Sequence, residues 1–433
     1  DACAMLILHL TWEYPPVMFG GLGRHVHSLA AAQAANGHDV VVITQAPNSA
    51  APARVPRGAS GPVHVVRASV DGSTHDPRDL LAHVAEMECE FTGAGNRLFT
   101  RWQPDVIHAH DWMVAHAAVA LRTRSGAPLT TTIHATEAGR HRGWVTTDLS
   151  VAIHGIEGWL ARTSDALIAC SQTMRDELRT LFGIGSTHVV PNGITPADWH
   201  PASGAAKRVR TEYAQGGPLL ACTGRAEWEK GVQTLLASMP ALRASHPGIR
   251  LLVAGRGSYL DELQRQAGHL GLNGSVHFLG WVSEEELRAI VAAADLAVTP
   301  SLYEPFGLVA PEAATIGTPL VVARAGGLAE FAGDDELALT FTPGDVASLE
   351  RAVDHALGDP QATRDRADRA RVTVRSEYGW DTVATQTTAV YGVARASLGT
   401  GPDDPRRNIS AARHALIPVS LDAPAGPLLD VPQ

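Results

Sequence analysis

The stretch LILHLTWEYPPVMFGGLGRHVHSLAAAQAANGHDVVVIT, residues 6–44, decides the fold. Its first five residues form an apolar run typical of a short buried strand, and VVVIT at residues 40–44 is another. Between them, a loop rich in proline and glycine leads into a helical pattern over residues 22–35, which an Asn-Gly pair ends. The stretch therefore predicts a strand–helix–strand unit whose two strands lie parallel in one sheet.

The same alternation of strands and helices runs through most of the chain. Further apolar runs typical of buried strands occur at residues 105–110, 130–135, 166–170, 188–192, 219–225, 251–255, 276–282, 295–301 and 319–323. Helical patterns separate them, so we predict an α/β protein whose parallel sheets are covered on both faces. A polar break at residues 195–218 divides the runs into two doubly wound, Rossmann-like sets. Ligands are expected in the crevice between the two sets, at the carboxyl ends of the strands.

These patterns divide the chain into four expected parts. Residues 5–200 form the first domain and residues 201–378 the second, with a hinge near residue 200. A helix at residues 379–397 is expected to pack back on the first domain. The proline-rich tail at residues 398–433 is expected to be flexible.

The composition is that of a globular enzyme. Of the 433 residues, 45% are hydrophobic and 18% are charged, and the net charge of −10 argues against a nucleic-acid binder. No apolar run reaches the roughly 18 residues of a membrane span, and the first residues lack a basic leader. Four scattered cysteines without a CxxC pair agree with a reducing compartment. We therefore expect a cytoplasmic protein; peripheral membrane contact and the oligomeric state stay open.

Two segments are candidates for binding a diphosphate. In the GGLG segment, Gly20 and Gly21 permit a ligand to approach the backbone at the start of a helix, where unpaired N–H groups favour anions. A tight structural turn is the alternative. In the GRAEWEKG segment, Arg225 and Lys230 follow a predicted strand and lie within reach of one diphosphate. Two solvated surface cations are the alternative there.

The segment EPFGLVAPE is a candidate sugar site. Glu304 follows a predicted strand, and we expect its carboxylate to accept hydrogen bonds from sugar hydroxyls in the crevice. The amides of Phe306, Gly307 and Leu308 are the expected donors. A helix is expected to begin near Leu308, which places Glu312 in its first turns. Glu312 is predicted to accept from two adjacent ribose hydroxyls, and a carboxylate that complements the helix dipole is the alternative.

Histidines at strand ends are the remaining candidates. His134 follows a central strand of the first domain and is a candidate for the reacting centre, with a structural histidine as the alternative. His108 and His110 point to the same side of their strand, but the sequence identifies no third ligand, so no metal site is expected. The chain has no Asp-x-Asp, so a nucleotide diphosphate would be neutralised by Arg225, Lys230 and helix N-termini.

With these motifs the chain resembles the retaining glycosyltransferases of family 4, which include the glycogen synthase type. The resemblance spans residues 6–396 and is carried by GGLG, HAHDW, IHA, VVPNGI, GRAEWEKG and EPFGLVAPE, of which the last is the most specific. It implies the GT-B fold, in which two Rossmann-like domains face each other across a cleft. The segments WEYPPVMFGGLGRHVH and HATEAGRHRGW look most like actinobacterial glucosyltransferases that build α-1,4-glucans, such as the precursor of methylglucose lipopolysaccharide.

The resemblance also implies roles for single residues. Gly21, Arg225 and Lys230 would bind the donor diphosphate, while Glu304 and the amides after it hold the donor sugar and Glu312 the ribose. His134 would sit beside C1 and C6 of the sugar. Glu13 matches a position on the acceptor side. One departure is Met18, which stands where glycogen synthases carry a lysine. It removes a cation from the donor phosphate, which counts against a standard ADP-glucose glycogen synthase and leaves UDP-glucose or another donor open.

Trp144 follows IHATEAGRHRG on a loop at the expected crevice mouth. Its ring is a candidate for stacking on an acceptor sugar, with core packing as the alternative.

The expected activity is transfer of glucose, with retention of configuration, from UDP- or ADP-glucose to a glucan or related sugar acceptor, forming an α-1,4 linkage. The nucleotide-sugar is a co-substrate, and no cofactor is expected. A nucleotide-sugar 2-epimerase of the same fold is an alternative, as is a family 4 transferase that uses another hexose donor or a sugar phosphate or lipid acceptor. A nucleotide-sugar-binding regulator without activity is disfavoured because the candidate residues are all retained.

Overall fold

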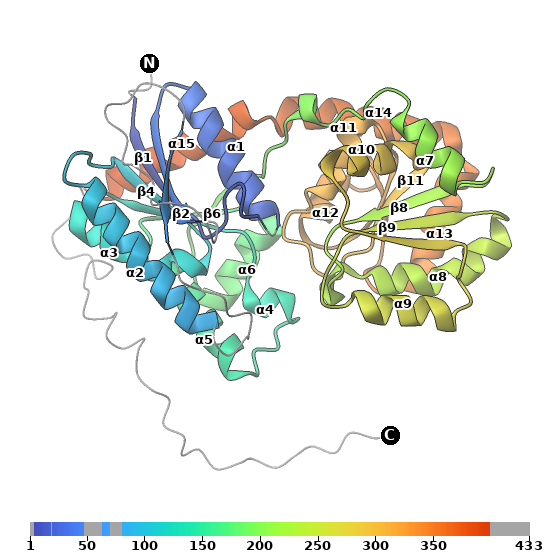
Figure 1. Ribbon diagram of the computed structural model, residues 1–433, viewed down its shortest axis with the longest axis horizontal. Helices are drawn as coiled ribbons and strands as arrows, with labels where there is room; N and C mark the ends of the chain where they lie inside the picture. The colour runs from blue at the N-terminus through green and yellow to red at the C-terminus, as the bar shows by residue number, and fades with distance from the viewer. Residues whose placement is uncertain (1–3, 19, 47–62, 70–79, 399–433) are drawn as a thin grey trace, which may run out of the picture.

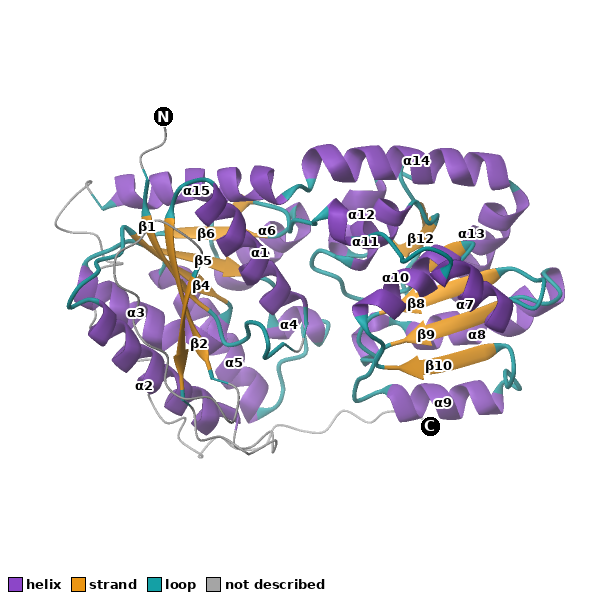
Figure 2. Ribbon diagram, turned by 45° about the horizontal axis from the view of Figure 1, so that its top comes forward, coloured by secondary structure: helices purple, strands orange, loops and turns teal. Residues whose placement is uncertain are grey.

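Two α/β domains lie side by side in the computed structural model, each a parallel sheet between layers of helices (Figures 1 and 2). The structure describes residues 4–18, 20–46, 63–69 and 80–398, so the proline-rich tail lies outside the described residues except for Leu398. The predicted fold class, two facing Rossmann-like domains with parallel sheets, is confirmed.

The first sheet has seven parallel strands in the order β3-β2-β1-β4-β5-β6-β7. They are β1 (Leu6–Leu10), β2 (Asp39–Gln45), β3 (His64–Ala68), β4 (Val106–His110), β5 (Leu129–Ile133), β6 (Ala166–Ala169) and β7 (His188–Val189). The helices are α1 (Gly21–Ala35), α2 (Leu80–Leu98), α3 (Ala115–Ser125), α4 (Glu137–Arg140), α5 (Asp148–Thr163) and α6 (Gln172–Phe182), with the 3-10 turn η2 (Trp112–Val114). The strand order reverses between β1 and β4, so the loops after these two strands diverge and open a crevice.

The second sheet has six parallel strands in the order β10-β9-β8-β11-β12-β13. They are β8 (Leu219–Thr223), β9 (Arg250–Ala254), β10 (Val276–Gly280), β11 (Leu296–Thr299), β12 (Leu320–Ala323) and β13 (Leu339–Phe341). The other elements are α7 (Ala205–Tyr213), α8 (Val232–Ser245), α9 (Leu260–His269), α10 (Glu284–Ala293), α11 (Val309–Ile316), α12 (Gly326–Ala332), α13 (Val346–Gly358) and α14 (Pro360–Glu377), with η3 (Pro196–Asp198) and η4 (Trp228–Lys230). Its order reverses between β8 and β11, the strands that precede the two candidate loops.

Three elements were absent from the sequence prediction. β3 and β13 are edge strands. Their burial alternates between buried and partly exposed residues, so neither reads as a continuous apolar run. α7 lies within the segment predicted as a polar break. Its Val209 and Tyr213 pack against a core cluster that includes Leu219 and Ile290. A nine-residue helix carries too few turns for that apolar stripe to stand out from its polar residues.

The last helix, α15 (Trp380–Ser397), packs on the first domain. Val383 and Val390 share an apolar cluster with Leu29 of α1 and Ile168 of β6. Tyr391 is fully buried, and its hydroxyl lies 3.0 Å from Gln33 Nε2 of α1 and 2.7 Å from His108 Nδ1 of β4. In both ribbon views α15 runs along the first domain, beyond α14 (Figures 1 and 2).

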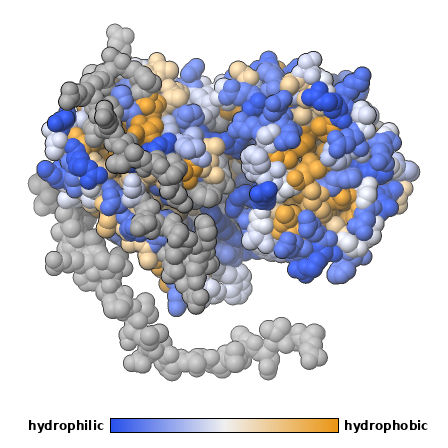
Figure 3. Space-filling view, in the orientation of Figure 1, coloured by the Kyte–Doolittle hydropathy of each residue, from blue (hydrophilic) through white to orange (hydrophobic). Residues whose placement is uncertain are grey.

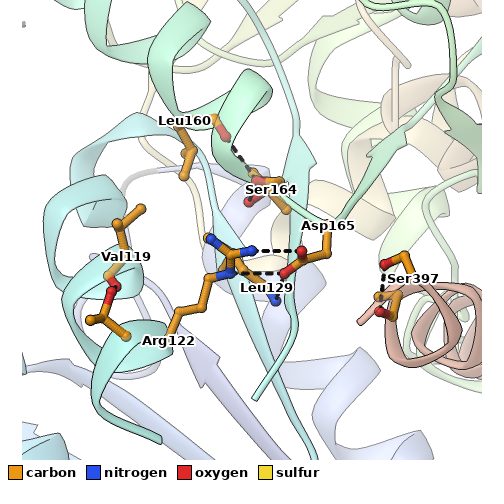
Figure 4. A network of polar contacts seen from close by, with 10 residues as sticks. Val119, Arg122, Leu129, Leu160, Ser164, Asp165 and Ser397 are labelled. Carbon is orange, nitrogen blue, oxygen red and sulfur yellow. Dashed lines mark hydrogen bonds and ion pairs between the residues drawn. The ribbon is translucent and has the colours of Figure 1, made fainter. Parts of the chain in front are cut away.

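An ion pair ties helix α3 to the start of β6. Arg122 Nε and Nη2 donate to the two carboxylate oxygens of Asp165 at 2.9 and 2.6 Å, and the Leu129 amide donates to the same carboxylate at 2.9 Å (Figure 4). This bidentate geometry fixes the helix against two neighbouring strands on the side of the sheet away from their carboxyl ends.

Side chains and backbone groups join the two domains directly. Ser171 Oγ donates to the Pro305 carbonyl at 2.7 Å, and the Tyr303 hydroxyl donates to Glu177 at 3.0 Å. Tyr303 and Phe306 of the second domain pack against the core of the first. In the space-filling view the two lobes meet along a boundary whose visible sides are largely hydrophilic (Figure 3). The structure therefore holds the two domains in contact over the candidate loops.

Candidate active site

Lys230 and Glu304 form one unit at the carboxyl ends of β8 and β11. Lys230 Nζ lies 2.8 and 3.0 Å from the two carboxylate oxygens of Glu304, and Ser301 Oγ donates to one of them at 2.9 Å. The Glu304 side chain is 9% exposed and that of Lys230 is 21% exposed. The sequence analysis predicted that both residues lie at the crevice, but it did not predict that they pair with each other. A sugar hydroxyl bound by Glu304 would therefore lie close to a fixed positive charge.

The loop between β11 and α11 has the shape that the sequence suggested. Leu308 is the N-cap of α11, Gly317 is its C-cap, and Glu312 lies in its first turn. Gly307 has a φ of +88°, and a Cβ atom there would lie 2.5 Å from Leu328, so this position needs glycine. The Phe306 ring, however, packs on the first-domain core, so only its backbone is left to serve a ligand.

Glu312 is paired across the domain boundary. The Arg24 guanidinium of α1 lies 3.0 Å from the Glu312 carboxylate. The Glu312 side chain is 8% exposed. Burial raises the pKa of Glu312 to about 7, and the Arg24 guanidinium opposes that shift. The sequence prediction missed Arg24. Its place one helical turn beyond Gly21 is the signal that could have found it.

His134 lies just past β5 and is held in place through its backbone amide. The Asp111 carboxylate accepts the His134 amide hydrogen at 2.7 Å, and Asp111 itself has a φ of 60°, which is uncommon outside glycine. Burial lowers the pKa of His134, while Asp111 opposes the shift, so the ring is neutral at pH 7. Two residues on, the Thr136 amide meets the Tyr303 hydroxyl at 3.3 Å, so His134 lies near the loop that carries Glu304. Asp111 was not predicted.

His134 ends a column of histidines. Its ring lies 3.3 Å from His110, whose other nitrogen lies 3.0 Å from His9 of β1. His25 of α1 packs edge-on to His134, and both of its buried ring nitrogens lack a hydrogen-bond partner. Burial lowers the pKa of His9, His25 and His110, so these rings are neutral.

The sequence identified no third ligand beside His108 and His110, and on this point it was wrong. His9 comes within ligand distance of both, and His25 and His134 do so with His110, so either trio could hold a metal ion. The His9 and His108 nitrogens already hydrogen-bond to Gln33, Tyr391 and Thr132. Independence of metal stays a prediction.

The GGLG loop is packed against Glu13. The Gly20 amide donates to Glu13 Oε2 at 3.1 Å, and a Cβ on Gly23 would lie 3.3 Å from Glu13 Cγ. Glu13 is buried, so its carboxylate holds the GGLG loop in place; its acceptor-side role stays a prediction. The Gly20 amide is therefore engaged with Glu13, which leaves Gly21, at the first position of α1, as the better candidate for a phosphate.

The remaining predicted residues lie near the surface. Arg225 pairs with Glu229 at 3.1 Å, and its side chain is 44% exposed. Trp144 is 72% exposed, so the core-packing alternative is wrong for this side chain. In the same loop, the Arg142 guanidinium lies 4.5 Å above the ring of Trp228, which belongs to the second domain. This loop of the first domain therefore touches the second domain through Arg142 and exposes the ring of Trp144.

Comparisons with known proteins agree with this geometry. The family model described as Glycosyltransferase Family 4 matches residues 19–198, and the one described as Glycosyl transferases group 1 matches residues 205–373. A protein named glycogen synthase from Mycobacterium tuberculosis is 44% identical over 95% of this chain and 99% of its own. The chain belongs to glycosyltransferase family 4. The resemblance inferred from the motifs is confirmed.

One further relative and one solved structure are similar to this family 4 protein. An alpha-maltose-1-phosphate synthase from Mycolicibacterium smegmatis is 29% identical over 89% of this chain and 99% of its own. The solved sucrose-phosphate synthase from Thermosynechococcus elongatus superposes with a TM-score of 0.77 at 24% identity, covering 91% of this chain and all of the other. The protein is accordingly a GT-B hexosyltransferase. Among the described residues, no helix is long and apolar enough to span a membrane.

Proposed function

We propose that this protein transfers glucose, with retention, from UDP- or ADP-glucose to a glucan or related sugar acceptor through an α-1,4 linkage. The observation that carries the proposal is the Lys230–Glu304 pair at the switch point of the second sheet. It offers an acceptor for sugar hydroxyls and a cation for a phosphate within one hydrogen-bonded unit. The relationship to a protein named glycogen synthase supports glucose as the sugar.

In the proposed reaction the bond between the anomeric carbon and the diphosphate breaks, and the electron pair leaves with the diphosphate. Lys230 and Arg225 stabilise the charge on the departing group, with Arg225 turning from Glu229 to the phosphate. The acceptor hydroxyl attacks from the side of the leaving group, and a diphosphate oxygen takes its proton. The configuration is therefore retained.

The test is turnover of each donor with a maltooligosaccharide acceptor. The proposal expects a longer oligosaccharide whose new anomeric proton has the coupling of an α linkage and whose new bond is cut by an α-1,4-specific glucosidase. Incubation with the donor alone separates the 2-epimerase alternative, since a transferase gives only slow hydrolysis. Conversion of the donor to its 2-epimer, or a β-linked product, would refute the proposal.

A phosphorylated sugar is the second candidate acceptor. Arg140, His141 and Arg142 follow one another, all exposed, on the loop whose Arg142 stacks on Trp228 of the second domain, close in sequence to the exposed Trp144. Basic groups next to an aromatic ring suit a sugar that carries a phosphate. The relative named alpha-maltose-1-phosphate synthase gives this candidate independent support. Competition between glucose 1-phosphate and maltooligosaccharide in the same assay decides which acceptor is preferred.

A further inference from the structure

Helices α1 and α11 meet across the domain boundary at two points that are one turn apart. A Cβ atom built on Gly21 would lie 3.0 Å from Leu308 Cδ1, so the backbone of α1 is pressed against the start of α11. One turn further along both helices, Arg24 Nη1 lies 3.0 Å from Glu312 Oε1. The close approach at the glycine therefore determines where the guanidinium of Arg24 reaches the second domain.

Glu312 has its charge compensated from the other domain. Burial is the main cause of its raised pKa, the Glu284 carboxylate adds to it, and Arg24 is the group that opposes it. Glu284 itself pairs with Arg288 of α10 at 2.8 Å. The other charged or titratable groups around α11 are His25 and His27 of α1 and Asp198 of η3, which line the same cavity of about 350 Å³, and Arg371 of α14, which approaches Gly317.

We propose that Arg24 is a positioning residue of the donor site, whose guanidinium orients the Glu312 carboxylate toward the ribose hydroxyls and so couples nucleotide affinity to domain closure. This inference rests on the proposed use of a nucleotide-glucose donor, and it takes for Glu312 the ribose-binding role that the family resemblance implies. Arg24 belongs to the first domain and Glu312 to the second, so the pair exists only while the domains are in contact. A nucleotide that gains from the ordered carboxylate therefore favours the closed arrangement.

The test is calorimetric titration of the full chain with UDP and with ADP. Arg24→Met is expected to weaken binding of the nucleotide that the wild type prefers by about tenfold at pH 7, the loss typical of a charge-assisted contact. Its kcat at saturating donor is expected to change less than threefold, because Arg24 does not touch the reacting atoms. Arg24→Lys keeps the positive charge but lacks the planar guanidinium that can form two parallel hydrogen bonds. It is expected to restore part of the affinity.

The pH dependence separates positioning from a general structural role. Without Arg24, the pKa of Glu312 lies higher than in the wild type, so the carboxyl is protonated at pH 7 and ionises as the pH rises. The affinity of Arg24→Met is therefore expected to recover as the pH rises above 7. Glu312→Gln, which cannot ionise, is expected to show no such recovery.

Arg371→Met is the matched control, since it removes a salt-bridged guanidinium beside the far end of α11 and leaves the Arg24–Glu312 pair and Glu284 untouched, so nucleotide affinity should stay at the wild-type value. In the double variant Arg24→Met/Glu312→Gln, affinity is expected to equal that of Glu312→Gln alone. The inference would be overturned if the two substitutions reduced nucleotide affinity independently, so that their factors multiply in the double variant. It would also be overturned if Arg24→Met bound nucleotide as tightly as the wild type. Failure of the wild type to bind any nucleoside diphosphate would instead overturn the proposed function.

Discussion

At the scale of single residues, the site consists of pairs that join distant parts of the chain. Lys230 and Glu304 come from different loops, and Arg24 and Glu312 come from different domains. The sequence identified three of these four residues because each follows a strand or begins a helix. It could not identify the pairings, because they depend on how two strand ends and two domains are placed relative to each other. The same reason hid Asp111, whose role is to hold the backbone of His134.

Removal of Lys230 is expected to affect both turnover and stability. Lys230→Met should lower kcat by more than tenfold, since it removes a cation proposed to stabilise the leaving group. It should also lower the free energy of unfolding by about 1–3 kcal/mol, because Glu304 stays buried without its partner. Steady-state kinetics and urea denaturation measure the two effects. Adding Glu304→Gln should restore part of the stability and none of the activity; wild-type turnover in Lys230→Met would contradict the diphosphate role.

Glu157 of α5 is expected to make stability depend on pH. It accepts the Glu137 amide hydrogen at 2.9 Å, and burial raises its pKa to about 8 from an unfolded value near 4.5. The folded state therefore holds the extra proton between these values, and stability is lost as the pH rises through this window. Glu157→Gln should flatten the slope of unfolding free energy between pH 5.5 and 7.5 by up to about 1.4 kcal/mol per pH unit. Denaturation at several pH values checks this, and parallel slopes for both proteins would contradict it.

At the scale of elements, the central strands could be predicted and the edges could not. Strands β1, β4, β8 and β11 are almost entirely buried, so their sequences are largely apolar. The histidines of β4 are exceptions whose rings bond to neighbouring elements, His108 to Tyr391 and Thr132 and His110 to His9 and His134. The sequence analysis did not predict the edge strands β3 and β13 or the short helix α7, which have no such constraint. The candidate loops follow these central strands, so the sequence could locate the loops themselves, while the roles of their residues stay predictions.

The turn between η4 and α8 fixes Lys230 and gives a test at this scale. Gly231 has a φ of +70°, and a Cβ atom there would lie 1.8 Å from the Pro300 carbonyl oxygen. Gly231→Ala should therefore lower the free energy of unfolding by at least about 2 kcal/mol and displace Lys230 from Glu304. Gly155→Ala, inside α5 with open space around it, is the control and should stabilise by about 0.5–1 kcal/mol. Thermal and chemical denaturation compare the two, and equal stability would contradict the steric argument.

At the scale of the whole molecule, one domain caps a helix of the other. Glu330 of α12 accepts the Gln172 and Thr173 amide hydrogens of α6 at 2.9 and 2.7 Å, and the Thr173 hydroxyl at 2.7 Å. These bonds satisfy the free amides at the start of α6 only while the domains touch. The contact lies beside the Ser171–Pro305 bond, so it acts directly on the loop that carries Glu304.

Loss of this cap is expected to favour the open arrangement. Glu330→Ala should raise the KM for the donor about threefold and enlarge the radius of gyration measured by small-angle scattering, since closure loses an exposed charge-assisted contact. Glu336→Ala, an exposed glutamate just beyond the same helix, is the control. An unchanged scattering curve together with an unchanged KM would show that the cap does not contribute to closure.

Because α15 packs on the first domain, the first domain to be synthesised is completed only when a helix near the end of the chain has been made. As the polypeptide emerges from the ribosome, residues 6–189 are complete long before Val383, Tyr391 and Val390 arrive to cover Leu29 and Ile168. Until then that apolar patch, together with the polar groups of Gln33 and His108, stays uncovered. A fragment cut at residue 200 would keep this patch permanently and is expected to aggregate, while adding the α15 segment back in trans should rescue it. The enzyme is thus two domains in shape and a single unit in its biosynthesis.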